Sequence, residues 1–268
     1  MEAINKMNSN LASDTSGNSY VAKGMAVKIE DLILRYNDAS TPLFSQLNVE
    51  LPAGQWTCLL GKSGCGKTTL LRHLAGLLED NVAWTGTIST SNKLPLNGNI
   101  AYMAQQDLLL PWLNVMDNVC LSARFGKAQK ADKQRAQALL EAVGLADKSD
   151  VMPNQLSGGM RQRVALARTL MQDKPLVLMD EPFSALDAVT RHKLQSLSAK
   201  LLEGKTVLLI THDPQEALRL GHQIYMMAGT PASIRALPVP SNLPPRQFDG
   251  ELATHQQGII NELENDYV

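Results

Sequence analysis

The feature of the sequence that most restricts its fold is a glycine-rich loop, residues 61–68, with the sequence Gly-Lys-Ser-Gly-Cys-Gly-Lys-Thr. It follows a short apolar run, Trp56–Leu60, which predicts a buried strand. It precedes a segment, Thr68–Leu78, whose leucines recur at helical spacing. Glycine lets the backbone take positive φ angles and come close to a phosphate, which a Cβ atom would obstruct. The loop therefore predicts a phosphate cradle at the amino end of a helix.

The last two residues of the loop add a charge and a metal ligand. Lys67 supplies a positive charge for the β- and γ-phosphates of a nucleotide, and the Thr68 hydroxyl can bind Mg²⁺. A flexible glycine loop joining a strand to a helix would explain the glycines, but not a Lys-Thr pair at the helix start. We interpret Cys65 as a filler residue and not as a nucleophile, because no histidine lies near it in the sequence.

Length and composition limit the remaining possibilities. A chain of 268 residues can bury one large core, or one domain with an inserted subdomain. A net charge of −1 gives no electrostatic reason to expect nucleic acid or acidic lipid as a partner. Three scattered cysteines fit a reducing cytosol, and no apolar run approaches the roughly 20 residues that span a bilayer. Residues 1–24, rich in Asn and Ser, predict a disordered tail that is neither a secretory signal nor an anchor.

The segment after the tail predicts short antiparallel strands at Ala26–Ile29, Leu32–Tyr36 and Phe44–Leu51. Tyr36 could stack on an adenine ring, or it could be an ordinary half-buried strand tyrosine, and the residues alone leave both open.

A further strand, Ile100–Met103, leads to Gln105 and then to an apolar stretch, Leu108–Trp112, broken by proline. This stretch is either core or an apolar docking surface, and core is the commoner fate of such a run. Helical patterns follow at Val115–Ala123 and at Asp132–Val143, the latter with Gly144 as its cap. We therefore expect an all-helical insert between strands.

Ser157 with Gly158 and Gly159 opens another predicted helix, whose buried stripe is Val164, Ala167, Leu170 and Met171. Small residues at a helix start can bind an anion. An ordinary capped helix explains the same residues equally well.

Two apolar runs end in polar side chains that suit catalysis. Leu176–Met179 leads to Asp180 and Glu181, which predicts a buried parallel strand opening into a site. Asp180 would help to hold Mg²⁺ and Glu181 would orient or deprotonate a water molecule, although a salt-bridged strand end is the structural alternative. Val207–Ile210 repeats this pattern and places His212 where it could bond a γ-phosphate. A proline-rich stretch, Pro238–Pro245, then leads to a small predicted helix at Phe248–Leu263.

Together these residues resemble the ATP-binding subunit of an ATP-binding cassette (ABC) transporter over roughly residues 25–230. The matching motifs are Walker A (Gly61–Thr68), the Q-loop glutamine (Gln105), the signature (Leu156–Met160), Walker B (Leu176–Asp180), the catalytic glutamate (Glu181), the D-loop (Ser184–Asp187) and the switch histidine (His212). The resemblance implies nucleotide contacts by Tyr36, Gly61, Ser63, Gly64, Cys65, Gly66, Lys67, Thr68, Thr69, Ser157, Gly158, Gly159 and Asp187. It implies Glu181, His212 and Gln105 as catalytic residues, and Thr68, Gln105 and Asp180 as Mg²⁺ ligands.

The resemblance also implies an architecture. The expected fold is α/β, a P-loop NTPase (RecA-like) core over residues 25–235 with an N-terminal antiparallel β-subdomain and an inserted all-helical subdomain at about 107–165, followed by an extension at 236–268. Two copies would form a head-to-tail dimer that holds two ATP molecules with Mg²⁺. Met160 stands where the family signature usually has glutamine, so any polar contact of that glutamine is in question.

The segment from Gln105 to Trp112 resembles importers of nitrate, sulfonates, taurine and hydroxymethylpyrimidine, a thiamine precursor. This implies a separate permease, an extracytoplasmic solute-binding protein and a place on the cytoplasmic face of the membrane. The sequence favours neither of two substrate classes, the pyrimidine thiamine precursor or a sulfonate or nitrate. The alternative is a soluble ABC ATPase with a non-transport partner. A DNA-acting member would need a long heptad insert, which the sequence lacks, so no nucleic acid is expected.

Overall fold

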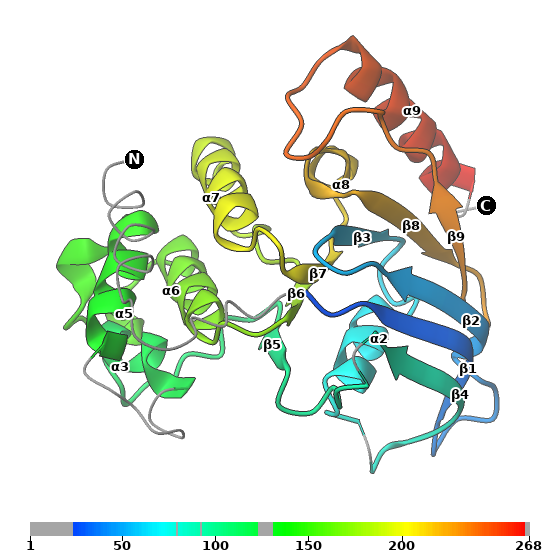
Figure 1. Cartoon of the computed structure of the whole chain (residues 1–268), viewed down its shortest axis with the longest axis horizontal. Helices are drawn as coiled ribbons and strands as arrows, with labels where there is room; N and C mark the ends of the chain where they lie inside the picture. Colours follow the sequence, from blue (N-terminus) through cyan, green and yellow to red (C-terminus); the bar gives the residue numbers. More distant parts are fainter. Residues whose placement is uncertain (1–23, 79, 92, 123–130, 266–268) are drawn as a thin grey trace. The chain divides into compact units, whose positions relative to one another are not determined.

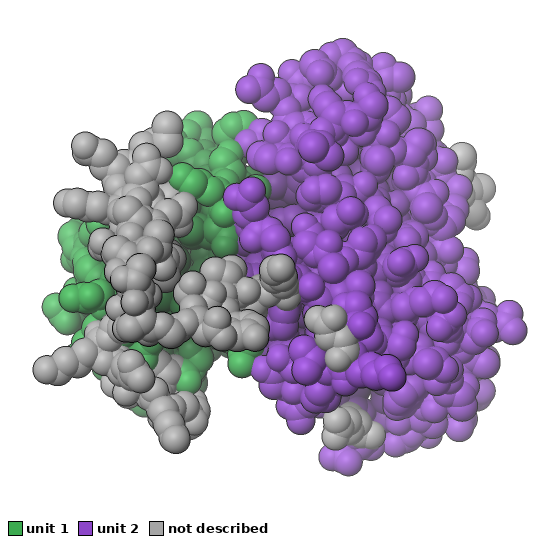
Figure 2. Space-filling model, viewed as in Figure 1, with its two compact units in different colours: residues 1–22, 103–174, 182–201 green, residues 23–102, 175–181, 202–268 purple. Residues whose placement is uncertain are grey.

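The computed structural model describes residues 24–78, 80–91, 93–122 and 131–265. The predicted tail, residues 1–24, lies outside this range except for Gly24. The described residues form two compact units, which Figure 2 colours separately. Unit 1 comprises residues 103–174 and 182–201, and unit 2 comprises the rest.

Unit 2 is built on a six-stranded sheet with the strand order β5-β6-β7-β3-β8-β9 (Figure 1). The strands are β3 (Trp56–Leu60), β5 (Ile100–Met103), β6 (Leu176–Asp180), β7 (Thr206–Ile210), β8 (Gln223–Ala228) and β9 (Ser233–Leu237). The predicted strands at Trp56–Leu60 and Ile100–Met103 are confirmed, as is the apolar run before Asp180.

The three strands that matter most for function are adjacent and parallel. Strand β7 pairs with β6 on one side and with β3 on the other, and Ile210 is the register partner of both Asp180 and Leu59. All fifteen residues of these strands are buried, as expected for parallel strands covered on both faces. Because parallel strands end at the same edge of a sheet, whatever follows β3, β6 and β7 meets there.

A second, three-stranded antiparallel sheet in unit 2 has the order β2-β1-β4 (Figure 1). The two predicted pieces Ala26–Ile29 and Leu32–Tyr36 form one strand, β1 (Val27–Tyr36), because a bulge with Asp31 at φ 50° keeps the pairing continuous. Strand β2 (Phe44–Leu51) is where it was predicted. Strand β4 (Val82–Thr90) has mostly exposed side chains and was not predicted.

Helix α2 (Lys67–Leu74) follows the phosphate loop and ends four residues before the predicted Leu78. Gly76 takes φ 70°, which a left-handed helix cap requires. The Leu77 amide donates to Arg72 O at 2.9 Å and the Gly76 amide donates to His73 O at 3.0 Å. This pair of bonds closes the helix one turn early, and it leaves Leu77 56% exposed.

In the carboxyl-terminal part of unit 2, the Arg246 side chain, which is 4% exposed, links the end of helix α8 (Pro214–Leu220) to the segment that follows β9. It contacts the end of helix α8, whose last carbonyls have no partner within the helix. One guanidinium nitrogen donates to Leu218 O at 2.6 Å and to Gly221 O at 2.7 Å. The others donate to Asn242 O at 2.7 Å and to Pro240 O at 3.2 Å. The predicted closing helix is confirmed as α9 (Gly250–Asn265), which packs on α8.

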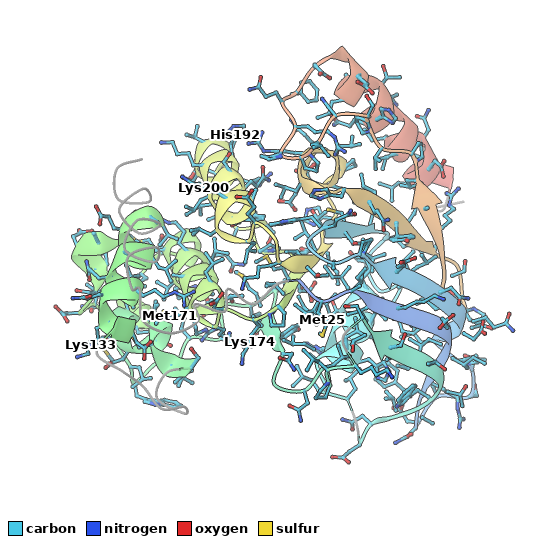
Figure 3. The ribbon with its side chains drawn as sticks, in the orientation of Figure 1. Met25, Lys133, Met171, Lys174, His192 and Lys200 are labelled. Atoms are coloured by element: carbon cyan, nitrogen blue, oxygen red, sulfur yellow. The ribbon has the colours of Figure 1, made fainter. Side chains whose placement is uncertain are left out.

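Figure 3 adds the side chains to this fold, with Met25 fully buried two residues before β1. In helix α7 (Ala188–Leu201) of unit 1, His192 and Lys200 are exposed, and Leu194 and Leu197 face the interior. Among the described residues, no helix combines the length and the apolar composition that crossing a bilayer requires.

Unit 1 is helical. Among its described residues, the other α-helices are α3 (Val115–Val119), α5 (Ala131–Ala142) and α6 (Gly158–Met171), and the 3₁₀ turns Ala146–Lys148 and Pro153–Gln155 lie between α5 and α6. Helix α3 ends before the predicted Ala123, which lies outside the described residues. The predicted apolar stripe of α6 is buried, α6 packs on α5, and Gly144 caps α5 with φ 70°. Unit 1 is larger than the predicted subdomain at about 107–165, because α6 continues to Met171 and α7 belongs to it. The domain limits at 25–235 and 236–268 stay predictions.

Candidate active site

The phosphate loop owes its shape to glycines with positive φ. Gly64 has φ 84°, and a Cβ atom built on it would meet no described atom within 4 Å, so the loop faces open space there. Gly66, the residue before α2, has φ 109°, and a Cβ on it would lie 2.6 Å from the Phe44 ring. Other residues are therefore strained at both positions, and the amides at the start of α2 remain available to an anion.

Lys67 is the charged group of the loop and is 7% exposed. Its ammonium donates to Gly61 O at 2.7 Å and to Lys62 O at 2.8 Å, and it lies 3.8 Å from Cys65 Sγ. These contacts hold the positive charge inside the curve of the loop, where a phosphate would meet it. Cys65 is 6% exposed, which fits its predicted role as a filler residue.

Thr68 and Asp180 connect the loop to the end of β6. Thr68 Oγ1 donates to Asp180 Oδ2 at 2.8 Å. Burial raises the pKa of the Asp180 carboxyl; the Thr68 bond opposes this, the Glu181 charge adds to it, and Arg72 and Lys67 oppose it. Asp180 Oδ1 is buried and has no hydrogen-bond partner among the described residues. A buried carboxylate oxygen without a partner, beside a hydroxyl, is a donor set that suits Mg²⁺.

Glu181 follows Asp180 in a strained conformation, with φ 48°. Its amide donates to Ile210 O at 3.0 Å, which fixes the backbone against β7. Its carboxylate Oε2 lies 3.2 Å from His212 Nδ1. The Glu181 side chain is 18% exposed and that of His212 is 63% exposed, so both can reach a bound molecule. Both residues come together because β6 and β7 end at one edge of the sheet.

Tyr36 lies at the end of β1 beside helix α2. Its hydroxyl shares a hydrogen bond with Thr69 Oγ1 at 3.0 Å. The ring is half-buried. The contact brings Tyr36 close to the phosphate loop, as a residue that stacks on the base of a nucleotide would need to be.

Ser157, in unit 1, is the amino cap of α6, and its Oγ accepts the Met160 amide at 3.3 Å. Ser157 and Gly158 are exposed. The contact uses only the backbone of Met160, so the substitution at this position leaves the cap intact. The helix start is therefore accessible to an anion.

The family is decided by comparison with known proteins. Residues 44–184 match the ABC transporter family. An uncharacterised ABC transporter ATP-binding protein of Haemophilus influenzae is 46% identical over 242 residues, which cover 88% of this chain and 98% of that protein. The chain belongs to the ABC transporter family.

Other relatives of this ABC ATPase carry more specific names. An aliphatic sulfonates import ATP-binding protein of Paracoccus denitrificans is 42% identical, over 75% of this chain and 79% of its own. A taurine import ATP-binding protein of Ruegeria pomeroyi is 41% identical, over 78% and 80%. A solved dimeric ATP-binding cassette with ADP and phosphate bound has a TM-score of 0.69 and 30% identity, and it covers 83% of this chain and 100% of its own. The predicted P-loop NTPase fold and ATPase activity are confirmed.

Two further predicted residues of the ABC ATPase lie in unit 1. Asp187 Oδ1 accepts the Thr190 amide at 3.0 Å and so caps α7, and this bond lowers the pKa of its carboxyl. Gln105 is exposed, two residues beyond the end of β5. The roles of both, like the other residue assignments, stay predictions.

The stretch Leu108–Trp112 is not core, contrary to its commoner fate. Leu108 is 58% exposed and Trp112 is 70% exposed, whereas Leu109 is 9% exposed and anchors the stretch. The physical reason is the left-handed backbone of Leu108, at φ 45°, which breaks any regular alternation of sides. The ABC ATPase therefore presents two large apolar side chains at this place.

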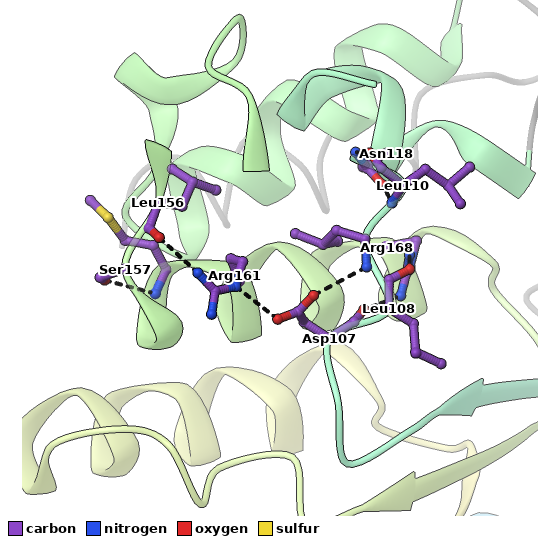
Figure 4. A network of polar contacts seen from close by, with 10 residues as sticks. Asp107, Leu108, Leu110, Asn118, Leu156, Ser157, Arg161 and Arg168 are labelled. Carbon is purple, nitrogen blue, oxygen red and sulfur yellow. Dashed lines mark hydrogen bonds and ion pairs between the residues drawn. The ribbon is translucent and has the colours of Figure 1, made fainter. Parts of the chain in front are cut away.

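Sequence reasoning missed a polar network in unit 1 that holds this stretch (Figure 4). Asp107 bonds Arg161, and the Arg168 guanidinium bonds the carbonyls of Asp107 and Leu108. Asn118 bonds the amide and the carbonyl of Leu110. The available signal was the spacing of Arg161 and Arg168, because residues seven apart lie on one face of a helix.

Proposed function

We propose that this chain is the ATP-hydrolysing subunit of a membrane importer for small organic sulfonates. The observation that carries the proposal is the meeting of Thr68 with Asp180, and of Glu181 with His212, at one edge of the sheet. A loop for phosphates, a pair of oxygens for a metal ion and a carboxylate for water are together what ATP hydrolysis requires.

Each group has a distinct task in this reaction. Lys67 and the loop amides bind the β- and γ-phosphates, and Tyr36 stacks on the adenine. Thr68 and Asp180, with Gln105, would hold Mg²⁺, which when bound neutralises charge on the phosphates. Glu181 orients the attacking water and accepts its proton, and the His212 imidazole bonds the γ-phosphate.

We further propose that the working form is a head-to-tail dimer closed by ATP. The amino end of α6, with Ser157, Gly158 and Gly159, would bind the γ-phosphate held by the loop of the other copy. Asp187 would contact the same nucleotide, from the same copy of the chain as Ser157. The exposure of Ser157 and Gly158 supports this, because a site for a second copy's ligand has to be open in one copy.

The stretch from Gln105 to Trp112 would receive a cytoplasmic helix of a separate permease. Exposed Leu108 and Trp112 suit an apolar groove. Through the permease, the ATPase would act at the cytoplasmic face of the membrane with an extracytoplasmic solute-binding protein. The sequence alone did not choose between a sulfonate and the thiamine precursor as the substrate. The names of the sulfonate and taurine relatives favour a sulfonate.

Two experiments test these points. Growth of the source cell without this chain should fail on taurine or an alkanesulfonate as the sulfur source and continue on sulfate. A requirement for hydroxymethylpyrimidine instead would replace the sulfonate assignment and keep the ATPase one.

The dimer is tested on the Glu181→Gln variant by size-exclusion chromatography with light scattering. We expect a monomer without nucleotide and a dimer with Mg·ATP, and replacement of Ser157 by glutamate should prevent the dimer by placing a negative charge against the γ-phosphate. A dimer that forms without ATP, or one that still forms after the Ser157 replacement, would contradict the proposed head-to-tail dimer.

A further inference from the structure

The exposed stretch Leu108–Trp112 is held in a strained shape by its neighbours. Leu108 has a left-handed backbone, which a branched side chain rarely adopts. Arg168 on helix α6 donates to Leu108 O at 2.8 Å and to Asp107 O at 2.6 Å, on either side of the strained peptide. The Leu109 amide donates to Asp107 Oδ1 at 3.2 Å. Strain of this kind persists only where the surroundings impose it, and here helix α6 does so.

A second arginine of α6 connects the same stretch to the signature. Arg161 Nε donates to Asp107 Oδ2 at 2.9 Å, while its terminal nitrogen donates to Leu156 O at 2.9 Å (Figure 4). Leu156 directly precedes Ser157. One guanidinium therefore joins the start of the apolar stretch to the turn that would meet the γ-phosphate.

We propose that Asp107, Arg161 and Arg168 are positioning residues that couple the conformation of Leu108–Trp112 to nucleotide contact at Ser157. The proposal rests on the nucleotide-closed dimer proposed above. A shift of the signature turn would move Arg161 and thereby break or shorten its bond to Asp107. The strained Leu108 can respond by leaving its left-handed conformation. Because coupling between two sites is reciprocal, whatever occupies the apolar stretch would alter the nucleotide contact in turn.

The test uses the full chain and Mg·ATP, without a permease. The chain has three tryptophans, so labelling with 5-fluorotryptophan gives three ¹⁹F resonances, which single Trp→Phe variants assign. On the Glu181→Gln background, we expect Mg·ATP to shift the Trp112 resonance as the dimer forms. Asp107→Asn keeps an oxygen for the Leu109 amide but removes the charge that faces Arg161.

Asp107→Asn and Arg161→Met should each lose this shift although dimers still form at saturating ATP. The ATP concentration at half-maximal dimer should rise roughly fivefold or more. The matched control is Arg163→Met, because Arg163 on the same helix also bonds two carbonyls, Val143 O at 2.9 Å and Gly144 O at 3.2 Å, and touches neither Asp107 nor Leu108 in the described contacts. This control should keep the shift, so a general loosening of unit 1 is separated from lost coupling.

The outcomes are distinct. Dimers that form with ATP while Trp112 does not respond, or a Trp112 shift that survives Asp107→Asn as fully as Arg163→Met, would overturn the coupling and leave the ATPase assignment standing. If the Glu181→Gln parent forms no dimer with Mg·ATP by light scattering, both the proposed head-to-tail dimer and the proposed coupling are refuted. The double variant Asp107→Asn with Arg161→Met should be no worse than the more severe single one, because both remove one interaction.

Discussion

The buried Arg246 allows the most quantitative prediction. Replacing it with methionine keeps much of its length but leaves four carbonyl oxygens, three of them in buried bonds, at 2.6–3.2 Å from the guanidinium without their donor. Hydrogen bonds to a charged group contribute roughly 1.5–3 kcal/mol each, which would give roughly 6–12 kcal/mol if they were independent. They share one side chain, whose burial is itself costly and lowers its pKa, so we expect a net loss of about 3–5 kcal/mol in the free energy of unfolding.

Thermal and urea unfolding followed by circular dichroism measure this loss. For a chain of this size it corresponds to a melting temperature lower by roughly 6–20 °C. Arg246→Lys should fall between, because an ammonium has three donors for four carbonyls. The control is Arg235→Met, which breaks the partly exposed ion pair with Glu262 and should cost about 1 kcal/mol. An Arg246→Met protein as stable as this control would refute the reasoning.

Three further predictions concern the site and the surface. Glu181→Gln should bind ATP, as measured by equilibrium dialysis, but lose nearly all steady-state turnover, and near-normal turnover would remove the catalytic role of Glu181. His222 Nδ1 accepts the Trp56 amide at 3.1 Å, and burial and then the Arg246 charge lower its pKa. The unfolded chain therefore binds the proton more readily, so stability should fall as pH drops below about 6.5, and His222→Asn should reduce this fall in urea titrations. Trp112→Ala should change the free energy of unfolding by no more than about 1 kcal/mol, because the side chain is 70% exposed, yet the variant should no longer co-purify with the permease. A clearly lower melting temperature would remove the docking role of Trp112.

The centre of the unit 2 sheet and the placement of the acids could be predicted from the sequence. The run before Asp180 is apolar without interruption and the run before Gly61 is interrupted only by Thr57, and this pattern specifies strands that are buried on both faces. Neighbouring parallel strands then bring the residues that follow them to one edge of the sheet. The proximity of Thr68 and Asp180 could therefore be predicted without knowing the conformation of the loops. Ser157 could be predicted as a cap because capping depends on neighbouring residues alone.

The sequence did not indicate features that depend on distant partners. Strand β4 has six exposed residues, a glycine and several threonines, so its strand character comes from pairing with β1 and not from an apolar pattern. Helix α2 ends early because Gly76 caps it. The sequence did not indicate this end, because Leu77 and Leu78 continue the helical spacing beyond the glycine. Asp107 and Arg168 are 61 residues apart, and no local rule connects them.

The order of the strands along the chain has a consequence for how the protein is made. Strand β3 lies between β7 and β8, which begin at Thr206 and Gln223, long after Trp56 has been synthesised. Ribosomes add about 5–20 residues per second, so the strand that leads into the phosphate loop waits roughly 8–30 s for its first neighbour. During that interval the apolar run Trp56–Leu60 has no sheet to join and is a natural substrate for a chaperone. A chain that ends before Thr206 lacks β7, and with it the strand that joins the phosphate loop's strand to the one that carries Asp180.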